Sequence, residues 1–130
     1  MPFASGRILV VDDEPPLLRM LSLYLGRLGY SVTAAESTDA AWRLVEAEPA
    51  AFTVAVLDGS MSGMSMDDLA LRMLRANQEL RVLAASGYPV DMRALSEAAP
   101  GRVDFLQKPF TPEMLAAALR GLLGAQEEKL

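Results

Sequence analysis

Carboxylates stand directly after two apolar runs of this chain. Residues 8–11 (Ile-Leu-Val-Val) run into Asp12 and Asp13, and residues 54–57 (Val-Ala-Val-Leu) run into Asp58. Carboxylates that are held close together repel one another unless a cation lies between them, and Mg²⁺ prefers oxygen ligands of this kind. A carboxylate can also act as the nucleophile in phosphoryl transfer. The three acids therefore indicate a Mg²⁺ site that supports phosphoryl chemistry, with Asp58 as the nucleophile.

Two further apolar runs end close to a hydroxyl and an amine. Ser86 directly follows residues 82–85, and Lys108 follows residues 103–106 after one intervening Gln. The Lys ammonium can pair with a carboxylate or with a phosphoryl oxygen, and the Ser hydroxyl can donate a hydrogen bond to such an oxygen. If the four runs are parallel strands, their carboxyl ends share one edge, where open α/β sheets bind ligands.

The composition removes several other kinds of chemistry. The chain has 130 residues, with no Cys and no His. Disulfides, thiolate catalysis, Cys metal sites, Ser-His-Asp triads and imidazole zinc sites are therefore excluded. With 52% hydrophobic and 22% charged residues, the sequence is typical of one globular domain. We expect a single domain over residues 1–130, with a core over about 7–123 and a C-terminal tail over 124–130.

The charge and hydropathy of the chain restrict its partners. The formal net charge is −5, so the domain as a whole repels nucleic-acid phosphates and anionic membranes, and we expect protein partners. The amino terminus lacks a long apolar stretch behind a basic start, and no run of about eighteen apolar residues occurs. These features predict a cytoplasmic location without a membrane anchor.

Helical periodicity follows the first apolar run. Leucines recur there at helical spacing, with Pro15 at the start and Gly29 at the end. A short β-stretch over residues 30–34 precedes a second helix, which Ser37 would cap and Pro49 would close. Helices and strands therefore begin to alternate from the first strand onward.

Three more helices are expected in the second half of the chain. Asp67 and Asp68 are favourable at a helix start. Residues 88–99 show little amphipathicity, so we expect a helix there that is mobile or faces a partner. Thr111 as N-cap and Pro112 at the first position mark the start of the last helix.

The alternation predicts an α/β fold of the (βα)₅ type, flavodoxin-like, with a doubly wound parallel sheet. Parallel neighbours require right-handed crossovers, and the helices supply them on both faces. The predicted strand order is 2-1-3-4-5. In that order the chain reverses direction across the sheet between the first and third strands, which places the crevice between Asp12, Asp13 and Asp58.

These residues make the chain similar to the receiver domain of bacterial two-component response regulators, from about Arg7 to Leu123. The motifs that carry the resemblance are residues 8–14 (ILVVDDE), Leu57-Asp58 with Met61 and Gly63 after it, residues 85–88 (ASGY) and residues 105–110 (FLQKPF). Together and in this order they are highly specific. The resemblance implies the fold derived above.

The resemblance also implies roles for the site residues. Asp58 would be phosphorylated, and Asp12, Asp13, Asp58 and the backbone carbonyl of Ser60 would organise Mg²⁺. Ser86 and Lys108 would contact the phosphoryl group. Because the chain has no His, the phosphodonor would be a histidine kinase or a histidine phosphotransfer protein, or another part of a longer parent protein.

Phosphorylation is expected to change the surface that a partner protein binds. By the same resemblance, Ser86 moves toward the phosphoryl group, Phe105 turns inward behind it, and the surface of the fourth helix, fifth strand and fifth helix changes for a downstream protein target. The Lys108–Pro109 bond is expected to be cis. A homodimer is also compatible with the sequence, although Ala118 stands where the DNA-binding subclass usually has Arg.

The chain departs from the family pattern after Asp58, where Ser62 replaces the usual Pro and Met66 a common Gly. An unusual path of this loop is therefore expected. Tyr88, two residues after Ser86, is bulky and would restrict the water that hydrolyses a phospho-aspartate. We hypothesise a persistent phosphorylated state.

Other functions fit the sequence less well. A Mg²⁺-dependent phosphatase of the haloacid dehalogenase type also uses an Asp nucleophile, but it usually needs a second Asp where this chain has Ser60, and it carries cap insertions. An interaction-only receiver would keep the fold without phosphorylation, which the intact acids, Ser86 and Lys108 argue against. A nucleotide-binding module is disfavoured because both glycine-rich phosphate motifs are missing. Whether the chain acts alone or is one domain of a hybrid kinase or larger regulator stays open.

Overall fold

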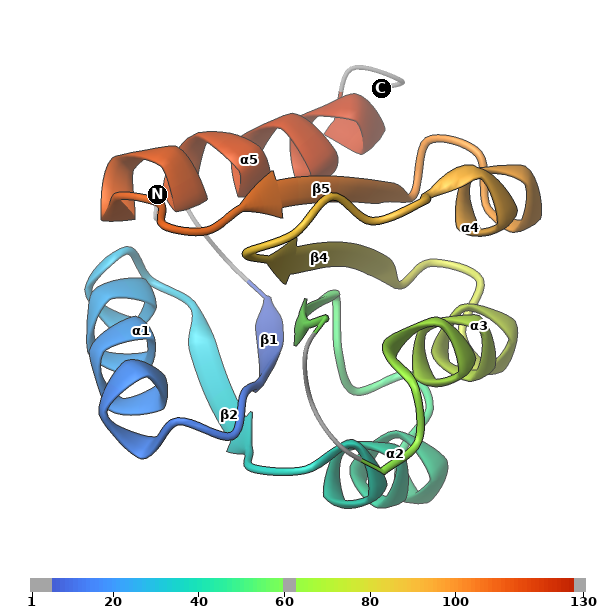
Figure 1. Ribbon diagram of the computed structural model, residues 1–130, viewed down its shortest axis with the longest axis horizontal. Helices are drawn as coiled ribbons and strands as arrows, with labels where there is room; N and C mark the ends of the chain where they lie inside the picture. The colour runs from blue at the N-terminus through green and yellow to red at the C-terminus, as the bar shows by residue number, and fades with distance from the viewer. Residues whose placement is uncertain (1–5, 60–62, 128–130) are drawn as a thin grey trace.

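The computed structural model describes residues 6–59 and 63–127, and for residues 125–127 it describes the backbone alone. Within these residues the chain forms one parallel sheet in the order β2-β1-β3-β4-β5, covered by helices on both faces (Figure 1). The strands are β1 (Arg7–Val11), β2 (Ser31–Ala35), β3 (Val54–Asp58), β4 (Arg81–Ser86) and β5 (Val103–Gln107). The helices are α1 (Pro15–Arg27), α2 (Thr38–Ala47), α3 (Met66–Ala76), α4 (Arg93–Ala98) and α5 (Pro112–Glu127). The predicted (βα)₅ fold and its strand order are confirmed.

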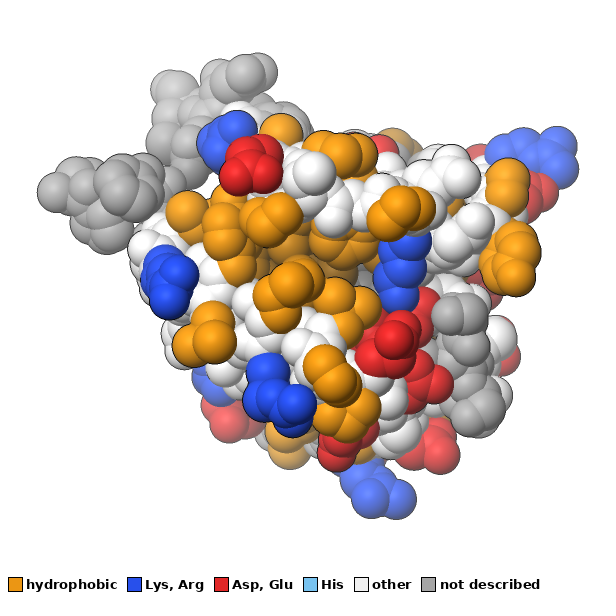
Figure 2. Space-filling view, turned by 60° about the vertical axis from the view of Figure 1, so that its left-hand side comes forward, with side chains coloured by type: hydrophobic (Ala, Val, Ile, Leu, Met, Phe, Trp, Pro, Cys, Tyr) orange, Lys and Arg blue, Asp and Glu red, His pale blue; other side chains and the backbone are white. Residues whose placement is uncertain are grey.

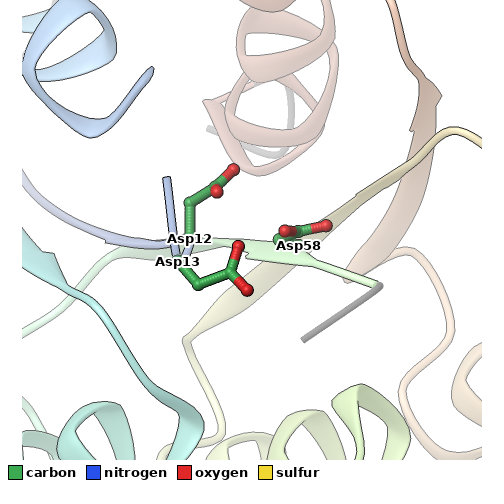
Figure 3. A group of neighbouring side chains, drawn as sticks. All are labelled: Asp12, Asp13 and Asp58. Carbon is green, nitrogen blue, oxygen red and sulfur yellow. The ribbon is translucent and has the colours of Figure 1, made fainter. Parts of the chain in front are cut away.

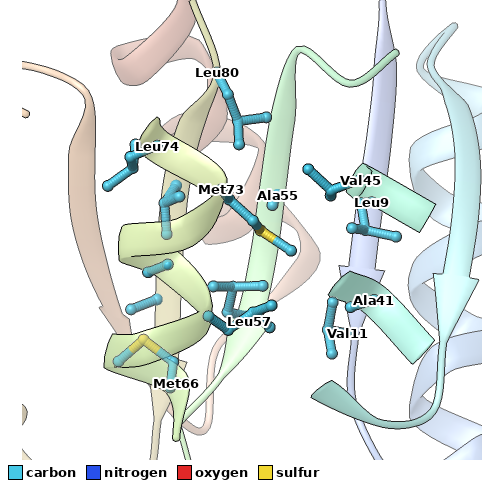
Figure 4. Close-up of a cluster of buried hydrophobic side chains, with 14 of the residues drawn as sticks. Leu9, Val11, Ala41, Val45, Ala55, Leu57, Met66, Met73, Leu74 and Leu80 are labelled. Carbon is cyan, nitrogen blue, oxygen red and sulfur yellow. The ribbon is translucent and has the colours of Figure 1, made fainter. Parts of the chain in front are cut away.

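The sheet separates two apolar cores. Successive side chains of a strand point to opposite faces, so Ile8 and Val10 of β1 pack with α1 and α5 while Leu9 and Val11 pack with α2 and α3. Figure 4 shows the second of these cores, in which side chains from α2 and α3 meet those of β1 and β3. Burial on both faces explains why these strands read as continuous apolar runs rather than as alternating ones.

The predicted helix signals operate in the structure. The Ser37 hydroxyl accepts a hydrogen bond from the N–H of Ala40 at 3.0 Å, and the Thr111 hydroxyl accepts one from the N–H of Met114 at 3.1 Å. Gly29, just past the end of α1, has a φ of +108°, a conformation that favours glycine. These caps fix where α1, α2 and α5 begin or end relative to the sheet.

Three boundaries differ from the sequence expectation. α3 begins at Met66 with Ser65 as its N-cap, one residue before the predicted acids. α4 has six residues and starts at Arg93, so the preceding stretch of the expected 88–99 helix is irregular. α5 runs through Glu127, so it includes residues that we expected in the C-terminal tail.

In the part of the chain that the structure describes, no helix combines the length and the apolar character needed to cross a membrane.

Candidate functional site

The register of the sheet brings the strand-end acids together. Val11 of β1 pairs with Leu57 of β3, so the next residues, Asp12 and Asp58, lie side by side at the carboxyl edge. Asp58 in turn pairs with Ala85, which precedes Ser86. The edge predicted from the sequence therefore exists, because parallel pairing places these strand ends at the same level.

Asp12, Asp13 and Asp58 form one acidic cluster. Each offers a carboxylate oxygen within 4.8 Å of the other two, and Figure 3 shows the three side chains around a common space beyond β1 and β3. Asp12 and Asp58 are 3% exposed, whereas Asp13 is exposed. Two buried carboxylates at this separation require a compensating positive charge.

Lys108 supplies part of that charge. Its Nζ lies 3.3 Å from Asp12 Oδ2 and 3.3 Å from Asp58 Oδ1. Partial burial disfavours the ammonium form of Lys108, but the Asp12 and Asp58 carboxylates outweigh that cost and raise the pKa of Lys108. The peptide bond from Lys108 to Pro109 is cis, as the resemblance led us to expect.

The four charged residues fit a divalent cation. Three carboxylates facing one ammonium leave a formal charge of −2, and every ligand atom that the cluster offers is a hard oxygen. Mg²⁺ binds to such groups through one or two carboxylates while keeping several waters. The Asp12 carboxylate is held in place, because its Oδ1 accepts the N–H of Glu14 at 3.0 Å.

Ser86 ends β4 next to the cluster and is 3% exposed. Its hydroxyl accepts a hydrogen bond from the N–H of Tyr88 at 3.1 Å, and its carbonyl accepts one from the N–H of Lys108 at 2.8 Å. Ser86 is therefore tied both to the loop after β4 and to the residue that pairs with the acids. The hydroxyl proton stays available for donation.

The structure describes Phe105 and Tyr88 but not all of the other residues singled out from the sequence. Phe105 is partly buried and packs against the core on the α2–α4 face, beside the small residue Ala84 with which it pairs. Tyr88 is 75% exposed. Ser60, whose carbonyl the resemblance assigns to Mg²⁺, and Ser62, whose substitution predicted an unusual loop, lie outside the described residues.

Sequence reasoning missed Gly59, the residue between Asp58 and Ser60. Its N–H donates to the carbonyl of Ala85 at 2.7 Å, so it joins the ends of β3 and β4 beyond the last residue of β3. A glycine at a strand end signals a close approach of backbone or side chain. The glycine was visible in the sequence, but the residue that it approaches could not be identified without the register of β3 and β4.

An apolar surface lies on the α1 side of the molecule. Figure 2 brings the α1 side of the molecule forward and shows hydrophobic side chains around a shallow hollow, next to a group of acidic side chains. Partly buried residues of α1 and α5 pack over the core on this face, among them Leu17, Tyr24, Ala118 and Leu123. Apolar surfaces of this kind are typical of sites of contact between proteins.

Comparison with known protein families agrees with this geometry. The family model of the response regulator receiver domain matches residues 8–120. The chain belongs to the response regulator receiver domain family. The acidic cluster of this receiver fits the phosphorylation and Mg²⁺ binding of receiver domains.

Individual relatives support the same assignment. The receiver is 33% identical over 120 residues to the transcriptional regulatory protein YvrH of Bacillus subtilis, a match that covers 92% of this chain and 49% of YvrH. The chain spans about half the length of the first curated relatives that it matches. Their activities as whole proteins therefore reach beyond this domain.

Two solved structures share the fold. A CheY-like receiver domain from Methanospirillum hungatei superimposes with a TM-score of 0.84 at 23% identity, covering 98% of this chain and 100% of that one. The response regulator TrrA of Thermotoga maritima, solved in complex with Mg²⁺-BeF, gives a TM-score of 0.73 at 26% identity, with coverages of 89% and 97%.

Proposed function

We propose that this receiver accepts a phosphoryl group on Asp58 and signals through the change of surface that follows. The observation that carries the proposal is the buried Asp58 carboxylate, which lies within 4.8 Å of Asp12 and Asp13 and 3.3 Å from the Lys108 ammonium. A nucleophilic carboxylate, a cation site and a fixed ammonium are together what phosphoryl transfer requires.

In the transfer, a carboxylate oxygen of Asp58 bonds to phosphorus while the bond from phosphorus to the donor atom breaks and its electron pair leaves with the donor. Asp12, Asp13 and Asp58 would hold Mg²⁺, which neutralises charge on the phosphoryl oxygens when it is bound. Lys108 moves from pairing carboxylates to pairing a phosphoryl oxygen, and the Ser86 hydroxyl donates to another. Because charge spreads over these oxygens, correct placement of the donors supplies most of the catalysis.

The donor is a phosphohistidine of a histidine kinase or a histidine phosphotransfer protein. The receiver itself has no His, and the apolar hollow on the α1 side of the molecule in Figure 2 offers a surface for docking of such a donor. Relatives of this chain are response regulators, including the phosphate regulon transcriptional regulatory protein PhoB of Pseudomonas aeruginosa. The output passes to a protein target through α4, β5 and α5.

Incubation with acetyl phosphate and Mg²⁺, followed by intact-protein mass spectrometry, tests the proposal. The parent should gain one phosphoryl group, and neither Asp58→Asn nor the parent in EDTA should do so. Glu79→Gln serves as a matched control, because Glu79 is an exposed acid away from the cluster. A parent that stays unmodified under conditions in which it is folded would favour the interaction-only receiver. Release of phosphate in many turnovers from small esters would favour the phosphatase.

A further inference from the structure

The backbone conformation of Gly59, the residue after Asp58, does not explain why this residue is glycine. Four glycines of the described chain have a positive φ, at positions 6, 29, 63 and 101, and Gly59 is not among them. An L-residue could therefore adopt the backbone conformation of Gly59 without strain. The need for glycine must come from the space around it.

That space is filled by Ser86. A Cβ built on Gly59 would lie 3.1 Å from Ser86 Cβ, closer than ordinary van der Waals contact, and 3.5 Å from Ser86 Oγ. It would also lie 3.5 Å from the carbonyl oxygen of Ala85, which accepts the Gly59 N–H. The short hydrogen bond holds the two strand ends together, so a side chain at position 59 could be accommodated only by moving Ser86.

Ser86 cannot move without affecting the rest of the site. Its carbonyl accepts the N–H of Lys108, the residue that pairs with Asp12 and Asp58, and its hydroxyl accepts the N–H of Tyr88. Ser86 is also nearly fully buried, so its packed neighbours would have to adjust if it moved. A shift of a few tenths of an ångström at its Cβ would pass to the hydroxyl.

We infer that Gly59 is a positioning residue for the Ser86 hydroxyl, and that its missing side chain sets how closely this hydroxyl approaches a phosphoryl group on Asp58. The inference rests on the proposed function of Asp58. Gly59 is bonded to Asp58 but has no side chain to contribute to the acidic cluster, and a Cβ built at this position meets Ser86 and the Ala85 carbonyl. A larger residue at position 59 would displace the Ser86 hydroxyl and so slow the reaction that Ser86 assists.

A second glycine provides a matched control. Gly87 directly follows Ser86 in the sequence, its φ is not positive, and a Cβ built there meets no atom of the described residues within 4 Å. Gly59→Ala and Gly87→Ala thus each add one methyl group near the end of β4, the first in contact with Ser86 and the second clear of the described residues. Any general effect of replacing glycine in these loops should appear in both variants.

The test measures phosphorylation rates with acetyl phosphate and Mg²⁺ by intact-protein mass spectrometry. A misplacement of 1 Å can cost about 100-fold, so a shift of a few tenths should slow Gly59→Ala by roughly 3- to 10-fold, with Gly87→Ala within about twofold of the parent. In a Ser86→Ala background, which lacks the hydroxyl but keeps the Cβ, adding Gly59→Ala should slow the reaction by less than about twofold. Equal slowing in both backgrounds would show a structural effect that bypasses the hydroxyl.

Folding is measured in parallel by thermal unfolding. Ser86→Gly removes the Cβ that a residue at position 59 would meet, so Gly59→Ala/Ser86→Gly should unfold at the temperature of Ser86→Gly alone. A double variant that stays destabilised relative to Ser86→Gly would overturn the inference. So would Gly59→Ala reacting as fast as Gly87→Ala in a receiver whose parent is phosphorylated. A parent that takes no phosphoryl group would overturn the proposed function itself, and the inference with it.

Discussion

Removing the exposed member of the acidic cluster should stabilise the receiver when no divalent cation is present. Asp13 has an oxygen within 4.8 Å of oxygens of Asp12 and Asp58, and unlike them it has no contact with Lys108 among the described ion pairs. At 4.8 Å, two unit charges in a water-like dielectric repel by about 0.9 kcal/mol. Two such pairs, partly offset by attraction to the Lys108 ammonium, give a net gain of about 1 kcal/mol for Asp13→Asn.

Mg²⁺ should cancel the stability gain of Asp13→Asn. If the parent binds Mg²⁺ with a Kd of about 1 mM, a concentration of about 20 mM stabilises it by about 1.8 kcal/mol. Asp13→Asn loses a ligand. With a tenfold weaker Kd, the same Mg²⁺ concentration would stabilise the variant by only about 0.6 kcal/mol. The two proteins should therefore differ by about 1 kcal/mol in EDTA and by about zero in Mg²⁺.

Chemical and thermal unfolding in the two buffers measure the difference. A gain of about 1 kcal/mol corresponds to about 3–5 °C in Tm for a domain of this size. Added NaCl should reduce the gain, because Asp13 is exposed and its charge is screened. Glu79→Gln, which also removes one exposed negative charge, should show neither the gain in EDTA nor its loss in Mg²⁺. An Asp13→Asn variant that is no more stable than the parent in EDTA would refute the reasoning.

The remaining predictions concern four other features of the receiver. Lys108→Met leaves Asp12 and Asp58 buried without their partner and should lower the free energy of unfolding by about 1–3 kcal/mol, with the loss reduced in Mg²⁺. Because the pKa of Lys108 is raised, its ion pairs contribute fully below the ordinary value of about 10.4 and are lost as the pH rises through the higher folded pKa. Unfolding titrations above pH 10 should therefore lose this contribution in the parent and not in Lys108→Met. Tyr88→Ala should lose phosphate faster than the parent, measured as the decay of the phosphorylated mass, and an unchanged decay would reject a shielding role for Tyr88. Leu83→Ala removes a fully buried side chain of the interior strand β4 and should cost about 2–5 kcal/mol in urea unfolding, with a cost under 1 kcal/mol contradicting the packing.

The sheet could be predicted because its signals are local. Strands buried on both faces read as apolar runs, and the acids, Ser86 and Lys108 stand at their carboxyl ends. Once the runs are taken as parallel, a common edge follows without knowledge of any contact. The same reasoning led to the juxtaposition of Asp12 and Asp58, which the strand register then produced.

Features that depend on contacts distant in sequence could not be predicted. Arg102 donates to the carbonyls of Leu74, Asn77 and Leu80 and so closes the end of α3, although no pattern around Arg102 marks this role. The contact between Gly59 and Ser86 likewise requires the β3–β4 register. The start of α4 was missed for a different reason. Asp91 accepts the N–H of Arg93 at 3.0 Å, a local signal hidden within a stretch that lacks helical periodicity.

Mapping the modified residue tests the central claim most directly. An aspartyl phosphate is an acyl phosphate, which borohydride reduces to homoserine and thereby marks its position permanently. After treatment with acetyl phosphate and Mg²⁺, reduction and peptide mass spectrometry, homoserine should be found at position 58 and should be missing from the sample prepared in EDTA. Homoserine at position 12 or 13, or at no position in a folded sample, would contradict the assignment of Asp58 as the phosphoacceptor.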